Sequence, residues 1–209
     1  MSLEKQLQSE KLLPLYTVTD LSLLPIAEKI LLDNDLHFIE VTYRSDLASE
    51  AIRQLADSNK LIVGAGTVCD LATAQDAIAN GAQFIVMPGL NVDVVEYCNK
   101  NNIPVYPGAV TPTEIIQAMN LGLKTVKFFP ANVYGGLNAI KNLAGPFPKM
   151  KFIPTGGINE ENFTDYTTND SILAVGGSFI LSEKTIAADG GVAASKNIQT
   201  LIQKLENKS

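Results

Sequence analysis

The chain has 209 residues, of which 46% are hydrophobic and 18% charged, and its formal net charge is −6 at pH 7. The length and composition are those of a folded protein with one sizeable core, and a single α/β barrel fits within this length. The acidic balance argues against nucleic-acid binding, which requires a dominant basic patch, so no nucleic-acid partner is expected.

Histidine and cysteine usage argues against a metal site. The only histidine is His37, and the two cysteines, Cys69 and Cys98, have no metal or redox spacing. These side chains cannot form a typical zinc or two-histidine-carboxylate iron site, so neither a metal nor another cofactor is expected. We interpret the cysteines as free thiols in a reducing cytoplasm, and His37, which has apolar neighbours, as structural.

No apolar run of the sequence reaches the roughly 18 residues that cross a membrane. The first residues are charged and lack the apolar segment of a signal peptide. We therefore expect a cytoplasmic protein without a membrane partner.

Eight short runs rich in apolar and β-branched residues recur along the chain, and each is expected to form a strand. Their starts are roughly 20 to 26 residues apart, and each run is followed by a segment long enough for a helix. The runs cover residues 12–18, 38–42, 61–65, 84–87, 105–106, 125–129, 151–154 and 172–175.

Helix boundary signals lie between these runs. Ser45 and Thr111 are expected N-caps, with Pro112 in the first turn of the second of these helices. Gly81 and Gly122 fall where helix C-terminal glycines belong. Eight strand–helix units predict a single (β/α)8 TIM barrel over residues 1–209. A doubly wound open sheet is the alternative, although no GxGxxG motif follows the first strand.

In such a barrel the active site lies at the carboxyl ends of the strands. Lys127 lies within the apolar run 125–129, where strand alternation separates it from Val126 and Phe128. A lysine rarely occupies a buried strand without a specific role. Desolvation and a nearby cation favour the neutral amine, which can attack a ketone and form an imine. The alternative is a lysine held in a buried ion pair.

Glu40, Thr42 and Arg44 are spaced so that all three point the same way from the second strand and its end, above Phe38. A carboxylate facing an apolar barrel interior can shuttle protons, which makes Glu40 a candidate acid–base group. Arg44 is a candidate for gripping a substrate carboxylate in a bidentate fork. The alternative is a Glu40–Arg44 ion pair that only stabilises the barrel.

Double glycines follow the seventh and eighth strand runs, where many barrels bind phosphate. Glycine lets backbone N–H groups approach an anion without an obstructing Cβ, although a single Gly-Gly is more often a tight turn. Two such turns at adjacent strand ends favour a phosphate site, with hydroxyl donors beside the glycines. The residues assigned to it are Thr155, Gly156, Gly157, Gly176, Gly177 and Ser178.

Two further loops join the same rim. Thr67 follows the third strand run and could hydrogen-bond a substrate carboxylate; the alternative is a helix cap before Asp70. Pro88-Gly89 and Pro107-Gly108, after the fourth and fifth runs, are interpreted from their residues alone as turns.

These segments together resemble the bacterial 2-keto-3-deoxy-6-phosphogluconate (KDPG) / 2-keto-4-hydroxyglutarate (KHG) aldolase family over nearly the whole chain. The most specific stretch is 122–131, followed by Gly135-Gly136, which is similar to the family's Schiff-base segment. The remaining matching segments, in the same order and spacing, are 40–44, 64–67, 87–90, 107–112, 154–157 and 176–178.

The resemblance implies a class I lyase whose Lys127 forms a Schiff base with a phosphorylated 2-keto acid while Glu40 transfers protons. It implies that Arg44, Thr67 and Pro88 bind the substrate carboxylate. KDPG would yield pyruvate and glyceraldehyde 3-phosphate, and 4-hydroxy-2-oxoglutarate would yield pyruvate and glyoxylate. A homotrimer is also implied.

Three other functions are considered. One is cleavage of the galactonate epimer of KDPG. Another is a phosphate-binding barrel isomerase or epimerase that uses Glu40 without a covalent lysine. The third is a sugar-phosphate-binding protein without catalysis.

Three residues depart from the family pattern. Asp35 stands where glycine is usual, and Tyr43 replaces a leucine or phenylalanine. Asn132 stands where a glutamate commonly follows the Phe-Phe-Pro-Ala run. None of these positions is a catalytic candidate, but the change at Asn132 is expected to affect the edge of the aldehyde pocket and therefore sugar specificity.

Overall fold

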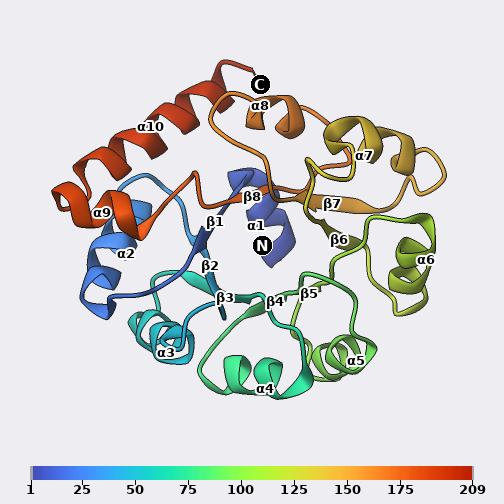
Figure 1. Cartoon of the computed structure of the whole chain (residues 1–209), viewed down its shortest axis with the longest axis horizontal. Helices are drawn as coiled ribbons and strands as arrows, with labels where there is room; N and C mark the ends of the chain where they lie inside the picture. The colour runs from blue at the N-terminus through green and yellow to red at the C-terminus, as the bar shows by residue number, and fades with distance from the viewer. Residues whose placement is uncertain (1, 209) are drawn as a thin grey trace.

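The computed structural model describes residues 2–208, and within them eight strands line a central barrel (Figure 1). Every registered strand pair is parallel, so all strands present their carboxyl ends at the same end of the barrel. The strands are β1 (Leu12–Tyr16), β2 (Phe38–Thr42), β3 (Ile62–Gly66), β4 (Phe84–Val86), β5 (Val105–Tyr106), β6 (Thr125–Phe128), β7 (Lys151–Pro154) and β8 (Val175–Gly177).

The strands close on themselves. They pair in the order β5-β4-β3-β2-β1-β8, and β6 pairs with β7. Isolated bridges join these two sheets, from Gly108 to Lys127 on one side and from Thr155 to Gly176 on the other. The predicted (β/α)8 barrel is confirmed, and the doubly wound open sheet is not the fold.

Helices surround the barrel as an outer ring, which Figure 1 shows end-on. After β8 the chain forms two helices in succession, α9 and α10, before it ends. The helices of the ring are α2 (Leu24–Leu32, preceded by the short 3₁₀ helix Leu21–Leu23), α3 (Ala48–Ser58), α4 (Leu71–Ala79), α5 (Val92–Lys100), α6 (Pro112–Asn120), α7 (Gly136–Ala144), α8 (Phe163–Thr167), α9 (Glu183–Asp189) and α10 (Val192–Glu206).

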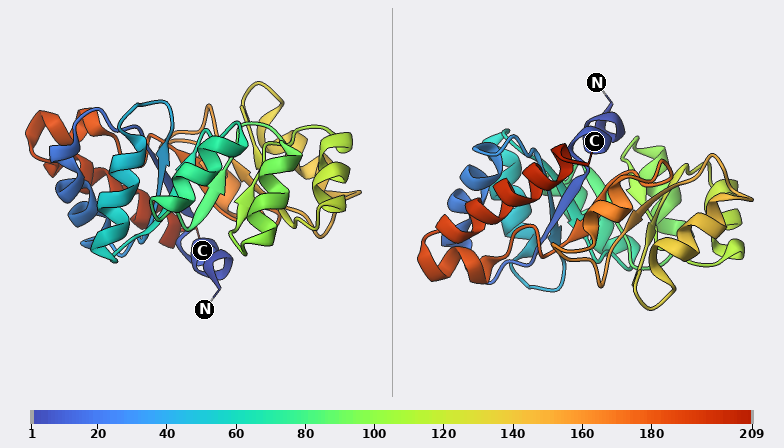
Figure 2. Two further views of the ribbon diagram at one scale, coloured as in Figure 1. Left: turned by 90° about the horizontal axis from the view of Figure 1, so that it is seen from below. Right: turned by 90° about the horizontal axis from the view of Figure 1, so that it is seen from above.

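Helix α1 (Leu3–Glu10) covers the amino end of the barrel, and both side views in Figure 2 show it projecting from that end. Its Leu7 is fully buried and joins the interior cluster that contains Phe38 and Phe84. Glu4 of the same helix accepts a hydrogen bond of 3.1 Å from the Thr125 hydroxyl at the start of β6. Because α1 closes this end, the accessible end of the barrel is the carboxyl end of the strands.

Most boundary predictions agree with the structure. Thr111 caps α6 in a capping box with Glu114, with Pro112 in the first turn. Gly81 and Gly122 follow α4 and α6 with positive φ values of 99° and 81°, a backbone conformation that glycine adopts without steric cost.

Two boundary predictions were wrong. Ser45 does not cap α3, which begins at Ala48; its hydroxyl instead accepts from the Leu47 N–H ahead of the helix. The eighth strand was expected at 172–175 but spans Val175–Gly177, so Gly176 lies inside it rather than after it. The reason is tertiary, because β1 pairs with residues 175–177 and sets the register.

His37 and the two cysteines occupy separate parts of the fold. His37 lies just before β2, and its Nδ1 is 3.1 Å from Glu10 Oε1, at the end of the barrel opposite the strands' carboxyl ends. Cys69 is exposed and Cys98 is buried, and both are free thiols. Among residues 2–208, no helix is long and apolar enough to cross a membrane.

Candidate active site

Lys127 projects from β6 into the barrel. Its backbone is fixed by the segment after β5, because its N–H donates to the Pro107 carbonyl and its carbonyl accepts from the Ala109 N–H. The residue is only 5% exposed. Its Nζ lies 3.4 Å from Glu40 Oε1 and 5.3 Å from the centre of the Phe129 ring. A buried amine in this position contacts one carboxylate and one aromatic face.

Glu40 reaches Lys127 from β2, on the other side of the barrel interior. It is 1% exposed, and its second oxygen, Oε2, is buried without a hydrogen-bond partner among residues 2–208. Glu40 therefore pairs with Lys127, and the expected alternative, an ion pair with Arg44, is not formed. A buried carboxylate with one unsatisfied oxygen is poised to bind a proton donor.

Gly66, at the end of β3, makes room for Glu40. A Cβ at Gly66 would lie 2.1 Å from Glu40 Oε1. This supporting role did not emerge from the sequence, although a glycine inside a strand often marks a close approach of another group. It identifies Gly66 as the residue that permits the Glu40–Lys127 contact.

Arg44 lies two residues beyond the end of β2 and lines the same pocket as Lys127. Its Nε donates to the Thr42 hydroxyl at 3.3 Å, and Thr42 is itself 2.7 Å from the Thr17 hydroxyl of the neighbouring β1 loop. The Arg44 guanidinium therefore lies at the rim of the pocket, above the buried contact between Glu40 and Lys127.

Thr67 and Pro88 also line the pocket. Thr67 has a φ of 61°, a left-handed conformation that is rare for a β-branched residue. It does not cap α4, because the Asp70 side chain is the cap. Backbone strain of this kind persists where the surrounding structure enforces it, frequently at functional sites.

The turn at Gly156 and Gly157 lies opposite Thr67, with φ values of 91° and 72°. Within residues 2–208, the N–H groups of Gly157 and Ile158 have no protein acceptor. The Thr155 hydroxyl is buried and also unpartnered. Successive free N–H groups in a glycine turn form a site for an anion.

Only one glycine of the second pair, Gly176-Gly177, lines the pocket. Gly176 lies within β8 and does not line the pocket. A Cβ there would be 2.5 Å from the Thr155 hydroxyl. Gly177 and Ser178 do reach the pocket. The absent side chain of Gly176 makes space for Thr155, and the assignment of Gly176 to phosphate binding stays a prediction.

The pocket at the carboxyl end of the strands has a volume of about 260 Å³. It brings together nine of the eleven residues assigned from the sequence; Gly176 is excluded, and Glu40 lies beneath, in contact with Lys127. Three apolar walls were not anticipated, because large apolar residues are indistinguishable from core in a sequence. The lining residues are Leu15, Arg44, Thr67, Pro88, Lys127, Phe129, Thr155, Gly156, Gly157, Ile158, Gly177 and Ser178.

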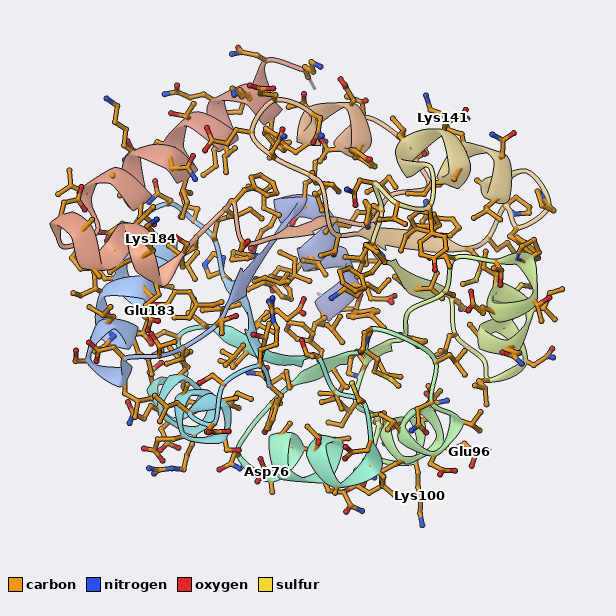
Figure 3. The ribbon with its side chains drawn as sticks, viewed as in Figure 1. Asp76, Glu96, Lys100, Lys141, Glu183 and Lys184 are labelled. Atoms are coloured by element: carbon orange, nitrogen blue, oxygen red, sulfur yellow. The ribbon has the colours of Figure 1, made fainter. Side chains whose placement is uncertain are left out.

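Two hydrogen-bond networks hold the loops around the pocket. Tyr43, next to Arg44, donates its hydroxyl to Asp76 of α4 at 2.7 Å, and Ser49 donates to the same carboxylate. The Ser49 and Tyr43 hydrogen bonds lower the pKa of Asp76, while burial is the main cause that raises the pKa of Tyr43. Figure 3 shows Asp76 on the outer side of α4.

The second network joins the loop after β1 to the helix after β8. Glu183, in the first turn of α9 (Figure 3), accepts from the backbone N–H and hydroxyl of Thr19 and from the backbone N–H of Asp20. Burial, with Glu183 and Asp20 as further causes, raises the pKa of the nearby Tyr16 hydroxyl. These contacts anchor the rim on the side of Gly177 and Ser178.

The residues offer little for a metal. Among residues 2–208, no group of three histidine, cysteine, aspartate or glutamate side chains is placed to hold an ion. The chemistry at hand is that of an amine, a carboxylate and an anion-binding turn at one end of a barrel. That set can form an imine, move protons and hold an anionic substrate.

Comparison with known proteins agrees with this chemistry. The chain matches the family described as KDPG and KHG aldolase over residues 3–198. A 2-dehydro-3-deoxy-phosphogluconate aldolase from Treponema pallidum (strain Nichols) is 40% identical over 165 residues, which are 78% of this chain and 78% of that protein.

Solved structures are similar over almost the whole chain. KDPG aldolase from Legionella pneumophila, with pyruvate captured as a covalent carbinolamine intermediate, has a TM-score of 0.91 and 29% identity, covering 96% of this chain and 98% of that one. KDPG aldolase of Zymomonas mobilis ZM4 with 3-phosphoglycerate has a TM-score of 0.84 and 31% identity, covering 99% of this chain and 94% of that one.

The fold, the buried lysine and these similarities define a class I aldolase, a carbon–carbon lyase that works through a covalent lysine adduct. The barrel alone would not establish this class, since the same fold supports many reactions. The chain belongs to the KDPG and KHG aldolase family.

Proposed function

We propose that this aldolase cleaves KDPG to pyruvate and glyceraldehyde 3-phosphate, with Lys127 as the nucleophile. The observation that carries the proposal is the 3.4 Å contact between Lys127 Nζ and Glu40 Oε1 inside a pocket that also contains a glycine turn. A nucleophile and its proton-transfer partner within hydrogen-bond reach are the usual signature of covalent catalysis.

The reaction begins when the neutral Lys127 amine adds to the C2 ketone. The hydroxyl of the resulting carbinolamine takes up a proton and leaves as water, which gives an iminium ion. Glu40, directly or through a water molecule, takes the C4 hydroxyl proton. The C3–C4 bond breaks, its electron pair moves into the iminium to form an enamine, and the aldehyde departs. Glu40 returns its proton to C3, and hydrolysis of the iminium releases pyruvate, the free amine and the proton taken up in the first step.

The remaining pocket residues hold the two ends of the substrate. Arg44, Thr67 and Pro88 bind the pyruvyl carboxylate on the rim near Lys127. The phosphate is bound at the opposite side by the free N–H groups of the glycine turn, with hydroxyl groups from Thr155 and Ser178. The similar Zymomonas protein with 3-phosphoglycerate supports a phosphorylated substrate.

A second activity, cleavage of 4-hydroxy-2-oxoglutarate to pyruvate and glyoxylate, is supported by the family's description, which includes KHG aldolase. It requires the same carboxylate and lysine contacts but leaves the glycine turn without a phosphate. The ratio of kcat/KM for the two substrates measures how much the turn contributes.

Borohydride reduction in the presence of pyruvate, followed by peptide mass mapping, tests the nucleophile. The expected adduct lies on Lys127 and is absent from Lys127→Ala. The matched control is Lys124→Ala, because Lys124 is an exposed lysine three residues earlier. An adduct that persists in Lys127→Ala, or none in the unmodified protein, contradicts the proposal.

For the whole molecule, we infer a single barrel domain that assembles as a homotrimer in the cytoplasm. Exposed apolar side chains support an assembly: Ile116 and Met119 on α6 are 49% and 45% exposed, and Val133 and Tyr134 before α7 are 70% and 49% exposed. Free thiols support a reducing compartment. Sedimentation equilibrium tests the trimer, and a monomer at micromolar concentration contradicts it.

A further inference from the structure

Arg44 is held by a neutral partner rather than by a carboxylate. Among residues 2–208, no aspartate or glutamate forms an ion pair with its guanidinium, and its hydrogen bond runs from Nε to the Thr42 hydroxyl at 3.3 Å. A carboxylate partner would orient the guanidinium but also offset its charge. A hydroxyl partner orients it and leaves the whole positive charge available at the pocket that Arg44 lines.

A second threonine takes up the proton of the Thr42 hydroxyl. Because Tyr16 pairs with Val41 in parallel register, the next residues, Thr17 and Thr42, come side by side, and their hydroxyl oxygens are 2.7 Å apart. Thr42 is fully buried, so its hydroxyl proton needs an acceptor in the protein, and within residues 2–208 that acceptor is Thr17. Thr42 therefore donates to Thr17 and accepts from Arg44.

The hydrogen bond to Thr42 uses Nε and leaves the terminal amino groups of Arg44, Nη1 and Nη2, for a ligand. Within the described part of the chain, residues 2–208, neither of these groups has a protein acceptor. Their parallel N–H groups match the two oxygens of a carboxylate. A carboxylate is the group that pyruvate shares with the 2-keto acids from which it is released.

The main chain beside Arg44 is also fixed. The Tyr43 N–H donates to the Gly66 carbonyl at 2.8 Å, and its hydroxyl donates to Asp76 at 2.7 Å. The freedom that remains to Arg44 is that of its own side chain, which the hydrogen bond to Thr42 restricts. Ordering a long side chain before the substrate arrives lowers the entropic cost of binding.

We propose that Thr42, supported by Thr17, is a positioning residue of this aldolase: the hydroxyl pair fixes the Arg44 guanidinium so that its terminal amino groups grip the substrate carboxylate. The inference rests on the proposed function, because it takes Arg44 as a carboxylate ligand. It adds that binding of pyruvate and of KDPG depends on two residues that do not line the pocket.

The test compares Thr42→Val, which removes the hydroxyl with little change of shape, with Thr42→Ser, which keeps it. Thr42→Val should raise KM for KDPG, and the pyruvate concentration for half-maximal borohydride trapping, by about ten-fold with kcat within about two-fold, as loss of one hydrogen bond to a charged group requires. Thr42→Ser should restore both constants. Thr17→Val should raise both by about three-fold, since it removes a bond between neutral groups.

Two controls separate positioning from a loss of stability. Thr125→Val removes the hydroxyl of another buried strand threonine, which bonds to Glu4 at the amino end of the barrel, and should change neither constant. Arg44→Leu should raise both constants by itself. Once the guanidinium is absent, adding Thr42→Val should have no further effect, a non-additivity that a general packing defect would not produce.

The inference is overturned if Thr42→Val leaves both constants unchanged, if it lowers kcat instead, or if Thr42→Ser is no better than Thr42→Val. It is also overturned if the effects of Thr42→Val and Arg44→Leu add. Should Thr42→Val not fold, Thr17→Val decides by the same criteria. If Arg44→Leu itself leaves both constants unchanged, the carboxylate role of Arg44 in the proposed function is refuted as well, which distinguishes the two failures.

Discussion

Glu40 and Lys127 are 87 positions apart in the chain, yet the fold brings their side chains within hydrogen-bond distance beneath the pocket. Both side chains are buried, so neither is solvated by bulk water, and each has the other as a hydrogen-bond partner. At the scale of single residues, the reactivity of the site therefore rests on this pair and on the groups that keep it in place.

The Glu40→Gln substitution should separate imine formation from turnover. The glutamine side chain fills the same space but cannot take a proton, so kcat is expected to fall by about 10²–10⁴-fold, the usual contribution of general acid–base catalysis. Borohydride trapping of pyruvate at Lys127 should persist, although more slowly. Steady-state kinetics and mass mapping provide the measurements, and full turnover in the variant would show that another group transfers the proton.

Gly66→Ala should reproduce part of the loss of kcat while both Glu40 and Lys127 are retained. The new Cβ would lie 2.1 Å from Glu40 Oε1, so the carboxylate must move away from Lys127. We expect kcat to fall by roughly 10²-fold, the typical cost of a 1 Å misplacement, and the free energy of unfolding to fall by about 1–3 kcal/mol from overpacking. Unchanged kcat would mean that Glu40 can act from a displaced position.

At the scale of secondary-structure elements, the helix N-termini contribute mainly to stability, whereas the loops after β6 and β7 shape the pocket. Helices such as α6 begin with local signals, and their N-terminal caps can be altered without reaching the pocket. The loops after β6 and β7 differ, because the residues that shape them, such as Asn132 and Gly157, belong to separate elements.

The capping box of α6 tests whether a helix N-terminal cap affects stability without affecting the pocket. Thr111→Ala removes the side chain that accepts from Glu114, and should lower the free energy of unfolding by about 1 kcal/mol. For a chain of this length that corresponds to a decrease in Tm of about 2–4 °C. The neighbouring Thr113→Ala, which removes no cap, is the control. KM should stay unchanged in both, and a raised KM in Thr111→Ala would show that α6 influences the pocket.

At the scale of the whole molecule, acid should weaken the fold through carboxylates that are hydrogen-bonded in the native state. The pKa of Asp76 is lowered by hydrogen bonds from Ser49 and Tyr43, and that of Asp70 by its bonds to the Thr73 backbone and side chain. Because their folded pKa values lie below the unfolded value of about 3.9, the unfolded chain binds more protons at low pH.

The stability contributed by these groups is therefore complete above about pH 4 and is lost as the pH falls through the lowered folded values. Asp76→Asn should be less stable than the unmodified protein at pH 7 and should show a shallower loss of stability between about pH 5 and pH 2. Urea unfolding at each pH measures this, with the exposed Asp170→Asn as control. Equal slopes for Asp76→Asn and the unmodified protein would contradict the assignment.

Short-range sequence patterns predicted the strands up to β7, the N-cap of α6 at Thr111, and the glycines that end α4 and α6 in a left-handed conformation. Alternation, capping and turn chemistry act between residues a few positions apart, so they can be recognised without knowing the fold. The same reasoning located the end of the barrel to which Lys127, Arg44 and the glycine turn converge, because parallel strands present their carboxyl ends together.

Tertiary structure decided the rest, because those features depend on contacts between distant segments. The register of β8 came from pairing with β1 and placed Gly176 inside the strand. The partner of Glu40 proved to be Lys127 rather than Arg44, since closing the barrel brings β2 and β6 face to face across its interior. The space at Gly66 and the packing of Asn132 on Gly157 likewise exist only after closure. The sequence alone determined the residues available for the chemistry, and the closed barrel determined which of them meet.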